Sequence, residues 1–181
     1  MTEEAAAAVG GGAVIGVDAG TVALRDADHL IGRLVAEVPL PGGAFVCTHP
    51  VRDDGRPRTA VTFTVPGPAA AARVRGRLSA LTAVVPPGPS RWPGGRGVVF
   101  PGSGRLRGTV TVAELLARTA VDRVVQLGDP AGPAPEALLD TRGHVRPEWR
   151  EGLFVLAVMP AAGGLLVPFE APDPTPCCAG H

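Results

Sequence analysis

Residues 43–67, GAFVCTHPVRDDGRPRTAVTFTVPG, contain the clearest fold signal in the chain. Strand-forming residues lie on both sides of a turn signal at Asp53-Asp54-Gly55. β-Branched and aromatic side chains, here Val51, Val61 and Phe63, favour extended backbone. The stretch therefore predicts a β-hairpin.

Outward from this hairpin, the remaining pattern mixes strands and helices. Residues 152–170 predict a second hairpin, because their first half is continuously apolar, as in a strand covered on both faces. Shorter strands are expected over 13–24, 98–100 and 122–129. Helices are expected over 26–38, 68–85, 111–119 and 135–143. The third of these helices begins with a capping box, Thr111 with Glu114.

The length of 181 residues fits one domain. We predict an α+β fold, a single domain with at least two antiparallel β-hairpins and three to four short helices. The domain is expected over 13–170, with a Gly/Pro/Arg-rich surface loop at 86–108. Residues 1–12 read as a disordered lead-in, and 171–181 as a proline-rich tail that carries cysteine and histidine.

The composition limits the classes of partner. Formal net charge is zero, so no overall charge draws the protein to nucleic acid or to an anionic membrane. All 17 basic residues are Arg, and Lys, Asn and Tyr are absent, which is typical of a GC-rich bacterial genome. An Arg at a given position is therefore no evidence of selection over Lys. A protein partner or self-association stays open.

The cellular location follows from the N-terminus and the cysteine count. The start of the chain is acidic at Glu3 and Glu4 and is interrupted by glycine, unlike a signal peptide. No stretch approaches the roughly 18 apolar residues of a membrane helix. We therefore expect a cytoplasmic protein whose three cysteines are reduced thiols.

Each cysteine lies close to a histidine in the sequence. Cys47 and His49 are two residues apart in the first hairpin, so their side chains are expected on the same face of a strand. The tail ends with the other three such residues, Cys177, Cys178 and His181. Thr175 and Pro176 suit the start of one helical turn, where thiolate is favoured over thiol. His181 then returns to the face of one cysteine.

These five residues predict a metal site if the tail folds back onto the hairpin. Sulfur and imidazole ligands suit Zn²⁺ first and Cu⁺ or Fe²⁺ next. The site would be structural or metal-handling, and it would be catalytic if one coordination position stayed open to water. Glu170 or Asp173 would then be a supporting or proton-transfer group.

Other interpretations of the same residues stay open. Cys47 fits a buried small apolar residue, and the terminal cysteines fit a frayed tail. One alternative is a non-enzymatic interaction module that uses the loop at 86–108. Another is a thiol-based enzyme or redox sensor with Cys177 or Cys178 as the nucleophile.

Further candidate motifs carry less weight. Arg91, Arg96, Arg105 and Arg107 with Trp92 resemble a basic stacking patch, but the neutral overall charge argues against nucleic acid. His144 has Asp140, Arg142 and Glu148 nearby in the sequence, without a nucleophile that can be placed. The chain contains neither GxSxG nor HExxH, so whether it is an enzyme stays open.

Overall fold

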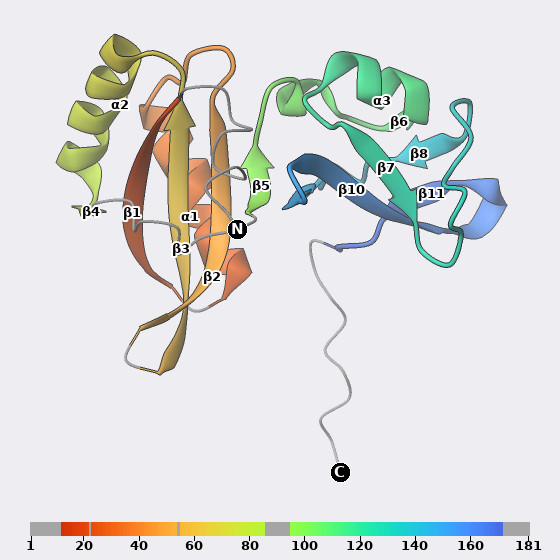
Figure 1. Ribbon diagram of the computed structural model, residues 1–181, viewed down its shortest axis with the longest axis horizontal. Helices are drawn as coiled ribbons and strands as arrows, with labels where there is room; N and C mark the ends of the chain where they lie inside the picture. The colour runs from red at the N-terminus through yellow and green to blue at the C-terminus, as the bar shows by residue number, and fades with distance from the viewer. Residues whose placement is uncertain (1–11, 22, 54, 86–94, 172–181) are drawn as a thin grey trace.

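The computed structural model describes residues 12–21, 23–53, 55–85 and 95–171 (Figure 1). In this part of the chain, eleven strands join into one mostly antiparallel sheet with three α-helices. The helices are α1 (Leu24–Glu37), α2 (Pro68–Leu81) and α3 (Val112–Arg118), with two short 3₁₀ turns, η1 (Ser103–Arg105) and η2 (Ala162–Gly164). The strands are β1 (Ala13–Thr21), β2 (Phe45–Asp53), β3 (Arg56–Val65), β4 (Val84–Val85), β5 (Arg96–Val99), β6 (Thr109–Thr111), β7 (Arg123–Gln126), β8 (Leu138–Asp140), β9 (Glu148–Arg150), β10 (Leu153–Pro160) and β11 (Leu166–Pro168).

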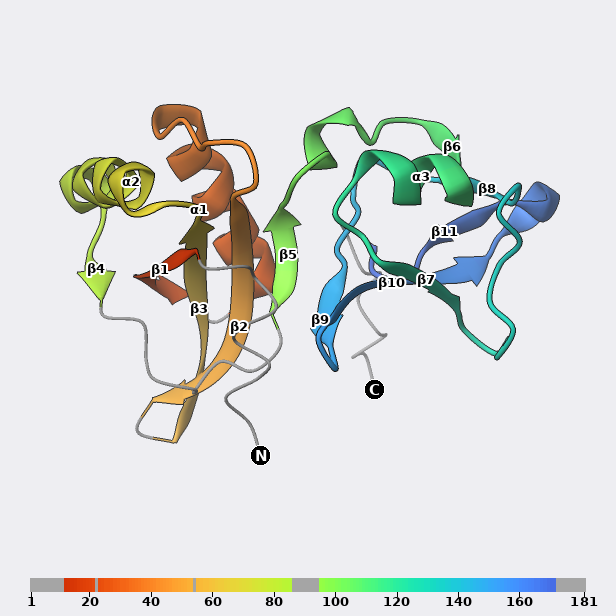
Figure 2. The same cartoon turned by 45° about the horizontal axis from the view of Figure 1, so that its top comes forward.

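The N-terminal half has the strand order β4-β1-β3-β2, with every neighbouring pair antiparallel. Its elements follow one another as β-α-β-β-α-β, which is the split β-α-β, or ferredoxin-like, arrangement. Both helices contact β1 and β3, and Figure 2 shows them on the same side of the sheet. The expected hairpin over 43–67 is present as β2 and β3.

Helix α1 buries one stripe of side chains against this sheet. Ala27, Ile31 and Leu34 recur at helical spacing and share a core with Ile15 and Phe63. The helix ends before Pro39, whose ring cannot continue it. The expected helix over 26–38 is therefore present, with its start two residues earlier than predicted.

Helix α2 is shorter than the sequence predicts. Pro68 occupies its first turn, where a missing N–H costs nothing. Ala71, Val74 and Leu78 are buried, whereas Leu81 is half exposed at the last helical position. The expected helix over 68–85 therefore ends at residue 81, and Val84–Val85 pairs with β1 as β4.

The C-terminal half is organised around β10. This strand pairs antiparallel with β9 and β11 and parallel with β7. Phe154, Leu156 and Val158 alternate along it and are buried in a second core. The predicted hairpin over 152–170 is thus present as β10 and β11, inside a larger sheet.

Local helix signals were right at one place in this half and wrong at another. The capping box at α3 forms in both directions, since Thr111 and Glu114 each accept from the other's backbone N–H. The predicted helix over 135–143 is wrong, because this segment forms β8. Leu139 is fully buried and pairs with Val110 of β6 and Leu166 of β11, so strand pairing overrides helix propensity.

Strand β5 connects the two halves of the sheet. It pairs with β2, and its Arg96 pairs with Glu148 of β9. Aromatic rings fill the junction beside it: the Phe45 and Phe100 ring centroids lie 5.6 and 5.3 Å from that of Phe154, and the Trp149 and Phe154 centroids are 4.8 Å apart. Rings at these separations attract each other beyond simple burial.

The α+β class is confirmed, in a sheet larger than two hairpins. The predicted lead-in over 1–12 and tail over 171–181 lie, apart from Gly12 and Ala171, outside the described residues. Among the helices that the structure describes, none has both the length and the apolar character needed to cross a membrane.

Candidate functional site

Cys47 and His49 lie side by side on β2, on the sheet face opposite α1 and α2. Strand alternation puts their neighbours Val46 and Thr48 on the other face, where Val46 joins the helix-covered core. Gly95 lies against both side chains. A Cβ at this glycine would stand 2.9 Å from Cys47 Cβ and 2.7 Å from His49 Cε1. The backbone of residue 95 therefore covers this pair, and both side chains are buried.

Both side chains of this pair interact with other parts of the protein. Burial raises the pKa of the Cys47 thiol to about 12, and a hydrogen bond with Trp149 lowers it by less. The thiol of the metal-free protein is therefore neutral at pH 7, and a metal ion would have to displace its proton on binding. His49 Nε2 is 2.8 Å from Thr62 Oγ1, a hydrogen bond that a ligand role for this nitrogen would break.

The other three predicted ligands, Cys177, Cys178 and His181, lie outside the described residues, as does Asp173. Within residues 12–171, less the gaps at 22, 54 and 86–94, no group of three or more His, Cys, Asp and Glu side chains could hold a metal ion. The described chain therefore brings together two of the five predicted ligands.

A charged cluster lies at the junction of the two halves, and Arg96 is its centre. The side chain of Arg96 is 7% exposed, and each of its five N–H groups has an acceptor. Asp28 of α1 accepts from Nη1 and Nη2 at 2.7 and 2.9 Å. Glu170, just after β11, accepts from Nε at 2.7 Å and also from Nη2. Thr48 Oγ1 completes the set at 3.4 Å from Nη1.

Arg146 and His144 extend this cluster. Arg146 Nε and Nη2 are each 3.1 Å from Asp28 Oδ2, and His144 Nε2 is 3.1 Å from Glu170 Oε1. We refer to Asp28, Arg96, His144, Arg146 and Glu170 as the junction cluster. Its two carboxylates balance its two guanidinium groups, so burial of the cluster leaves no large net charge.

The junction cluster holds its carboxylates in the ionised form. Burial alone would raise the pKa of Asp28 and of Glu170, but hydrogen bonds and charges from Arg96 outweigh it, so both pKa values lie below their ordinary range. The same ion pairs raise the pKa of Arg96 despite its burial. The carboxylates of Asp28 and Glu170 therefore stay ionised near pH 7. They form ion pairs between the two halves rather than exchange protons.

Sequence reasoning missed most of this cluster. It assigned Glu170 to a metal site, whereas Glu170 binds Arg96 and His144. It considered Arg96 only as a member of a basic patch, which it weighed against, whereas Arg96 is buried and paired. The partners are distant in the sequence, since Asp28 and Arg96 are 68 residues apart. No local pattern marks such a pairing.

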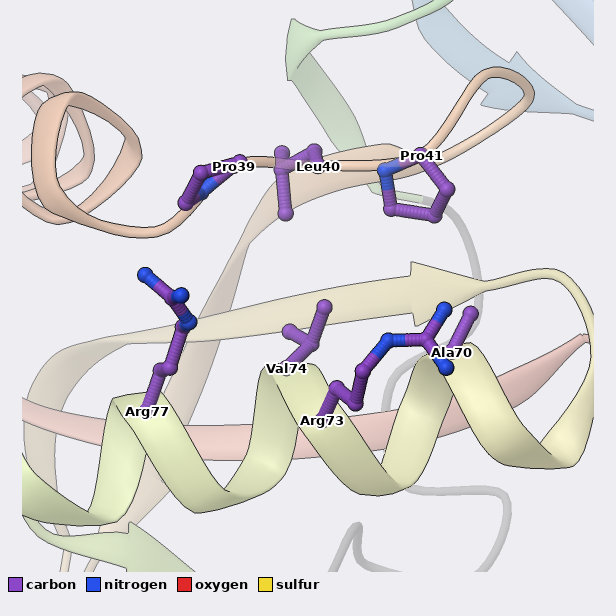
Figure 3. Close-up of a pocket in the computed structure, with 7 residues that line it drawn as sticks. All are labelled: Pro39, Leu40, Pro41, Ala70, Arg73, Val74 and Arg77. Carbon is purple, nitrogen blue, oxygen red and sulfur yellow. The ribbon is translucent and has the colours of Figure 1, made fainter.

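A surface groove lies between α2 and residues 39–41, with a volume of about 280 Å³ (Figure 3). Leu40 and Val74 face each other across it, and Pro39, Pro41 and Ala70 complete its apolar walls. Arg73 and Arg77 lie one turn apart on α2, and Figure 3 shows the Arg77 guanidinium pointing toward Pro39. No acidic residue is among its lining residues.

Some surface arginines in the described part of the chain form ion pairs, whereas others, including the two groove arginines and Arg33, Arg75 and Arg105, have none. Arg118 pairs with Glu114 at 3.0 Å, and Arg150 pairs with Glu148 at 2.9 Å. Within the described residues, Arg73 and Arg77 have no ion-pair or hydrogen-bond partner for their guanidinium groups. The groove therefore has two positive charges along its α2 side and an apolar floor, and Figure 3 shows the Arg73 guanidinium turned toward Ala70, away from that of Arg77.

No protein-family model, no curated protein and no solved structure matches this chain. The functional argument accordingly depends on the chain's own residues.

Proposed function

We propose that this protein is an interaction module that binds an acidic segment of a partner protein in the groove between residues 39–41 and α2. The observation that carries the proposal is the pair Arg73 and Arg77, which line one groove without a carboxylate partner in the described chain. The interaction module expected from the sequence would use the loop at 86–108, whereas the surface proposed here lies on α2.

The charge and the spacing of Arg73 and Arg77 indicate which peptide the groove would bind. Side chains four residues apart on a helix have Cβ atoms roughly 5–6 Å apart, so Arg73 and Arg77 suit two neighbouring carboxylates. Each guanidinium fork can bind one carboxylate through two parallel hydrogen bonds. Either Arg or Lys would supply the positive charge, so the absence of Lys from the chain does not matter here.

The apolar floor favours a peptide over a nucleic acid. Leu40 and Val74 form a floor that an aliphatic side chain can cover. No aromatic ring lines the groove, so there is no stacking surface for a base. An extended segment with an aliphatic residue flanked by acidic residues satisfies both features. The small size of the groove places the complex in the weak, transient class.

The experiment is a fluorescence anisotropy titration with a labelled peptide, acetyl-Glu-Asp-Leu-Asp-Glu, at low salt. The double variant Arg73→Gln/Arg77→Gln is expected to weaken binding at least tenfold. Arg75→Gln is the matched control, because Arg75 is exposed on the same helix but does not line the groove. Its effect should be less than threefold, because Arg75 lies outside the groove lining and cannot bind the peptide directly.

Three further probes distinguish the possible ligands of the groove. The neutral peptide acetyl-Gln-Asn-Leu-Asn-Gln should not bind measurably, because it offers no charge to the two guanidinium groups. Anionic vesicles and single-stranded DNA test a lipid surface and a nucleic acid. Tighter binding to either of these than to the acidic peptide would reject the proposal, as would equal peptide binding by the double variant.

Metal binding through Cys47, His49, Cys177, Cys178 and His181 is a second proposal, with Zn²⁺ expected first. The adjacency of Cys47 and His49 supports it, and the neutral, buried thiol of Cys47 weighs against it. Elemental analysis of protein purified without a histidine tag should find near-stoichiometric metal. Deletion of residues 177–181 should remove that metal. Equal metal content in the shortened chain would exclude the tail as a ligand source.

A further inference from the structure

A second pocket, of about 220 Å³, opens at the junction of the two halves. Its apolar walls are Val98, Leu106 and Val145. Its polar lining comes from Ser103, Gly104, Gly143 and Arg146, and none of its lining residues is acidic. We refer to this feature as the junction pocket. Val98 comes from β5, whereas the other residues follow β5 or precede β9, so a ligand there would contact both halves.

Arg146 lines the junction pocket. Its positive charge is only partly balanced by nearby carboxylates. Its Nη1 donates to the carbonyl oxygen of Val145, another wall residue, at 3.2 Å. Its one ion-pair partner among the described residues, Asp28, also binds Arg96 through both carboxylate oxygens, and Glu170 adds a weaker attraction. Asp28 Oδ2 therefore receives hydrogen bonds from two guanidinium groups at once.

The two arginines of the junction cluster differ in the direction of their pKa shifts. The pKa of Arg96 is raised, because Asp28 and Glu170 outweigh burial. The pKa of Arg146 is lowered, because burial outweighs the attraction of Asp28, and the nearby charge of Arg96 adds to the lowering. This contrast agrees with the geometry, in which Arg96 has two carboxylates and Arg146 shares one.

Donors also remain on the polar side of the pocket. Arg146 has five N–H groups, of which three have a described acceptor, through Nε, Nη2 and Nη1. The Ser103 hydroxyl accepts from the Phe100 N–H at 3.2 Å, and its own proton stays available as a donor. Donors beside apolar walls, in a pocket whose lining includes no acidic residue, fit an anion that carries a short apolar chain.

We propose that the junction pocket binds a small aliphatic carboxylate, with its carboxylate on Arg146 and its chain against Val98, Leu106 and Val145. A volume of about 220 Å³ suits a small ligand rather than a peptide or a nucleotide. Butanoate and pentanoate are therefore the right size. This site is separate from the groove on α2 and does not depend on the function proposed for that groove.

The experiment is a ¹⁵N-NMR titration of the full chain with sodium butanoate at constant ionic strength. Amide shifts are expected within residues 98–106 and 143–146, with a Kd on the order of 1 mM for so small a ligand. Butanamide has the same shape without the charge, and it should bind at least tenfold more weakly. Shifts centred on α2, or equal binding of butanamide, would overturn the proposal.

Two variants locate the site independently. Arg146→Gln should weaken butanoate binding at least tenfold, and Arg105→Gln, an exposed neighbour outside the pocket lining, should change it less than twofold. Since Arg146→Gln also removes a partner of Asp28, Val98→Phe provides a second test by filling the apolar wall. It should abolish binding while leaving the junction cluster intact. Wild-type affinity in Val98→Phe would overturn the proposal.

Discussion

Asp28 and Arg96, 68 residues apart in the sequence, form a bidentate ion pair with oxygen–nitrogen distances of 2.7 and 2.9 Å. The pair connects α1 to β5, and Glu170 adds the segment after β11 to the same guanidinium. Three distant parts of the chain thus meet at one buried side chain. The relative position of the two halves, and of the pocket between them, depends on this contact.

Removal of the Arg96 side chain should destabilise the protein strongly. Arg96→Met leaves Asp28 and Glu170 buried without their main partner, and such a loss costs about 3–5 kcal/mol in the free energy of unfolding. Urea unfolding followed by tryptophan fluorescence measures this change. Arg118→Met, which breaks an exposed ion pair with Glu114, is the control and should change the midpoint little. Equal effects of the two variants would contradict the structural role of the cluster.

Stability should fall in acid because of the same carboxylates. The pKa values of Asp28 and Glu170 are lowered in the folded protein, so the unfolded state binds more protons once the pH approaches their ordinary values near 4. Their contribution is fully present above that range and is lost as the pH falls through the folded pKa values. Urea midpoints between pH 6 and 3 should drop less in Asp28→Asn than in wild type. A parallel drop in both proteins would assign the acid sensitivity to other groups.

Gly97 should be intolerant of any side chain. A Cβ at this position would lie 2.3 Å from Cζ of Phe154, in the aromatic group at the junction. Overpacking of this kind costs roughly 1–3 kcal/mol, so Gly97→Ala should lower the urea midpoint. Gly104→Ala is the matched control, because a Cβ there meets nothing within 4 Å. A wild-type midpoint for Gly97→Ala would show that Phe154 moves aside freely.

Cys47 should be unreactive in the folded protein. Burial raises its pKa to about 12, so at pH 8 only about one thiol in ten thousand is ionised. In the variant Cys177→Ser/Cys178→Ser, a thiol reagent such as DTNB should label Cys47 only when urea unfolds the chain. Rapid labelling of the folded variant would show an accessible thiolate, and would favour a ligand or nucleophile role for this residue.

The sequence predicted those parts of the fold whose signals are local. The strand-forming residues of β2 and β3, the helical spacing of Ile31 and Leu34, and the capping box at Thr111 are local signals, and each appears in the structure. The helix predicted over 135–143 is wrong, because Leu139 pairs with β6 and β11, and neither strand is near it in the sequence. Such pairing cannot be read from a window of nine residues.

The candidate site was harder to predict for the same reason. The junction cluster pairs Arg96 with Glu170, which is 74 residues away in the sequence. No residue near either one indicates that the other is its partner. The groove had a partial signal, since Arg73 and Arg77 are four residues apart and thus share a helix face. The position of Pro39 to Pro41 opposite that face required the folded chain.

The most direct test of the proposed function is a ¹⁵N-NMR titration of the full chain with acetyl-Glu-Asp-Leu-Asp-Glu. If the groove binds acidic segments, the largest shifts will fall on Leu40, Ala70, Arg73, Val74 and Arg77, and they will vanish in Arg73→Gln/Arg77→Gln. Shifts that map to another face, or that persist in the double variant, would contradict the account.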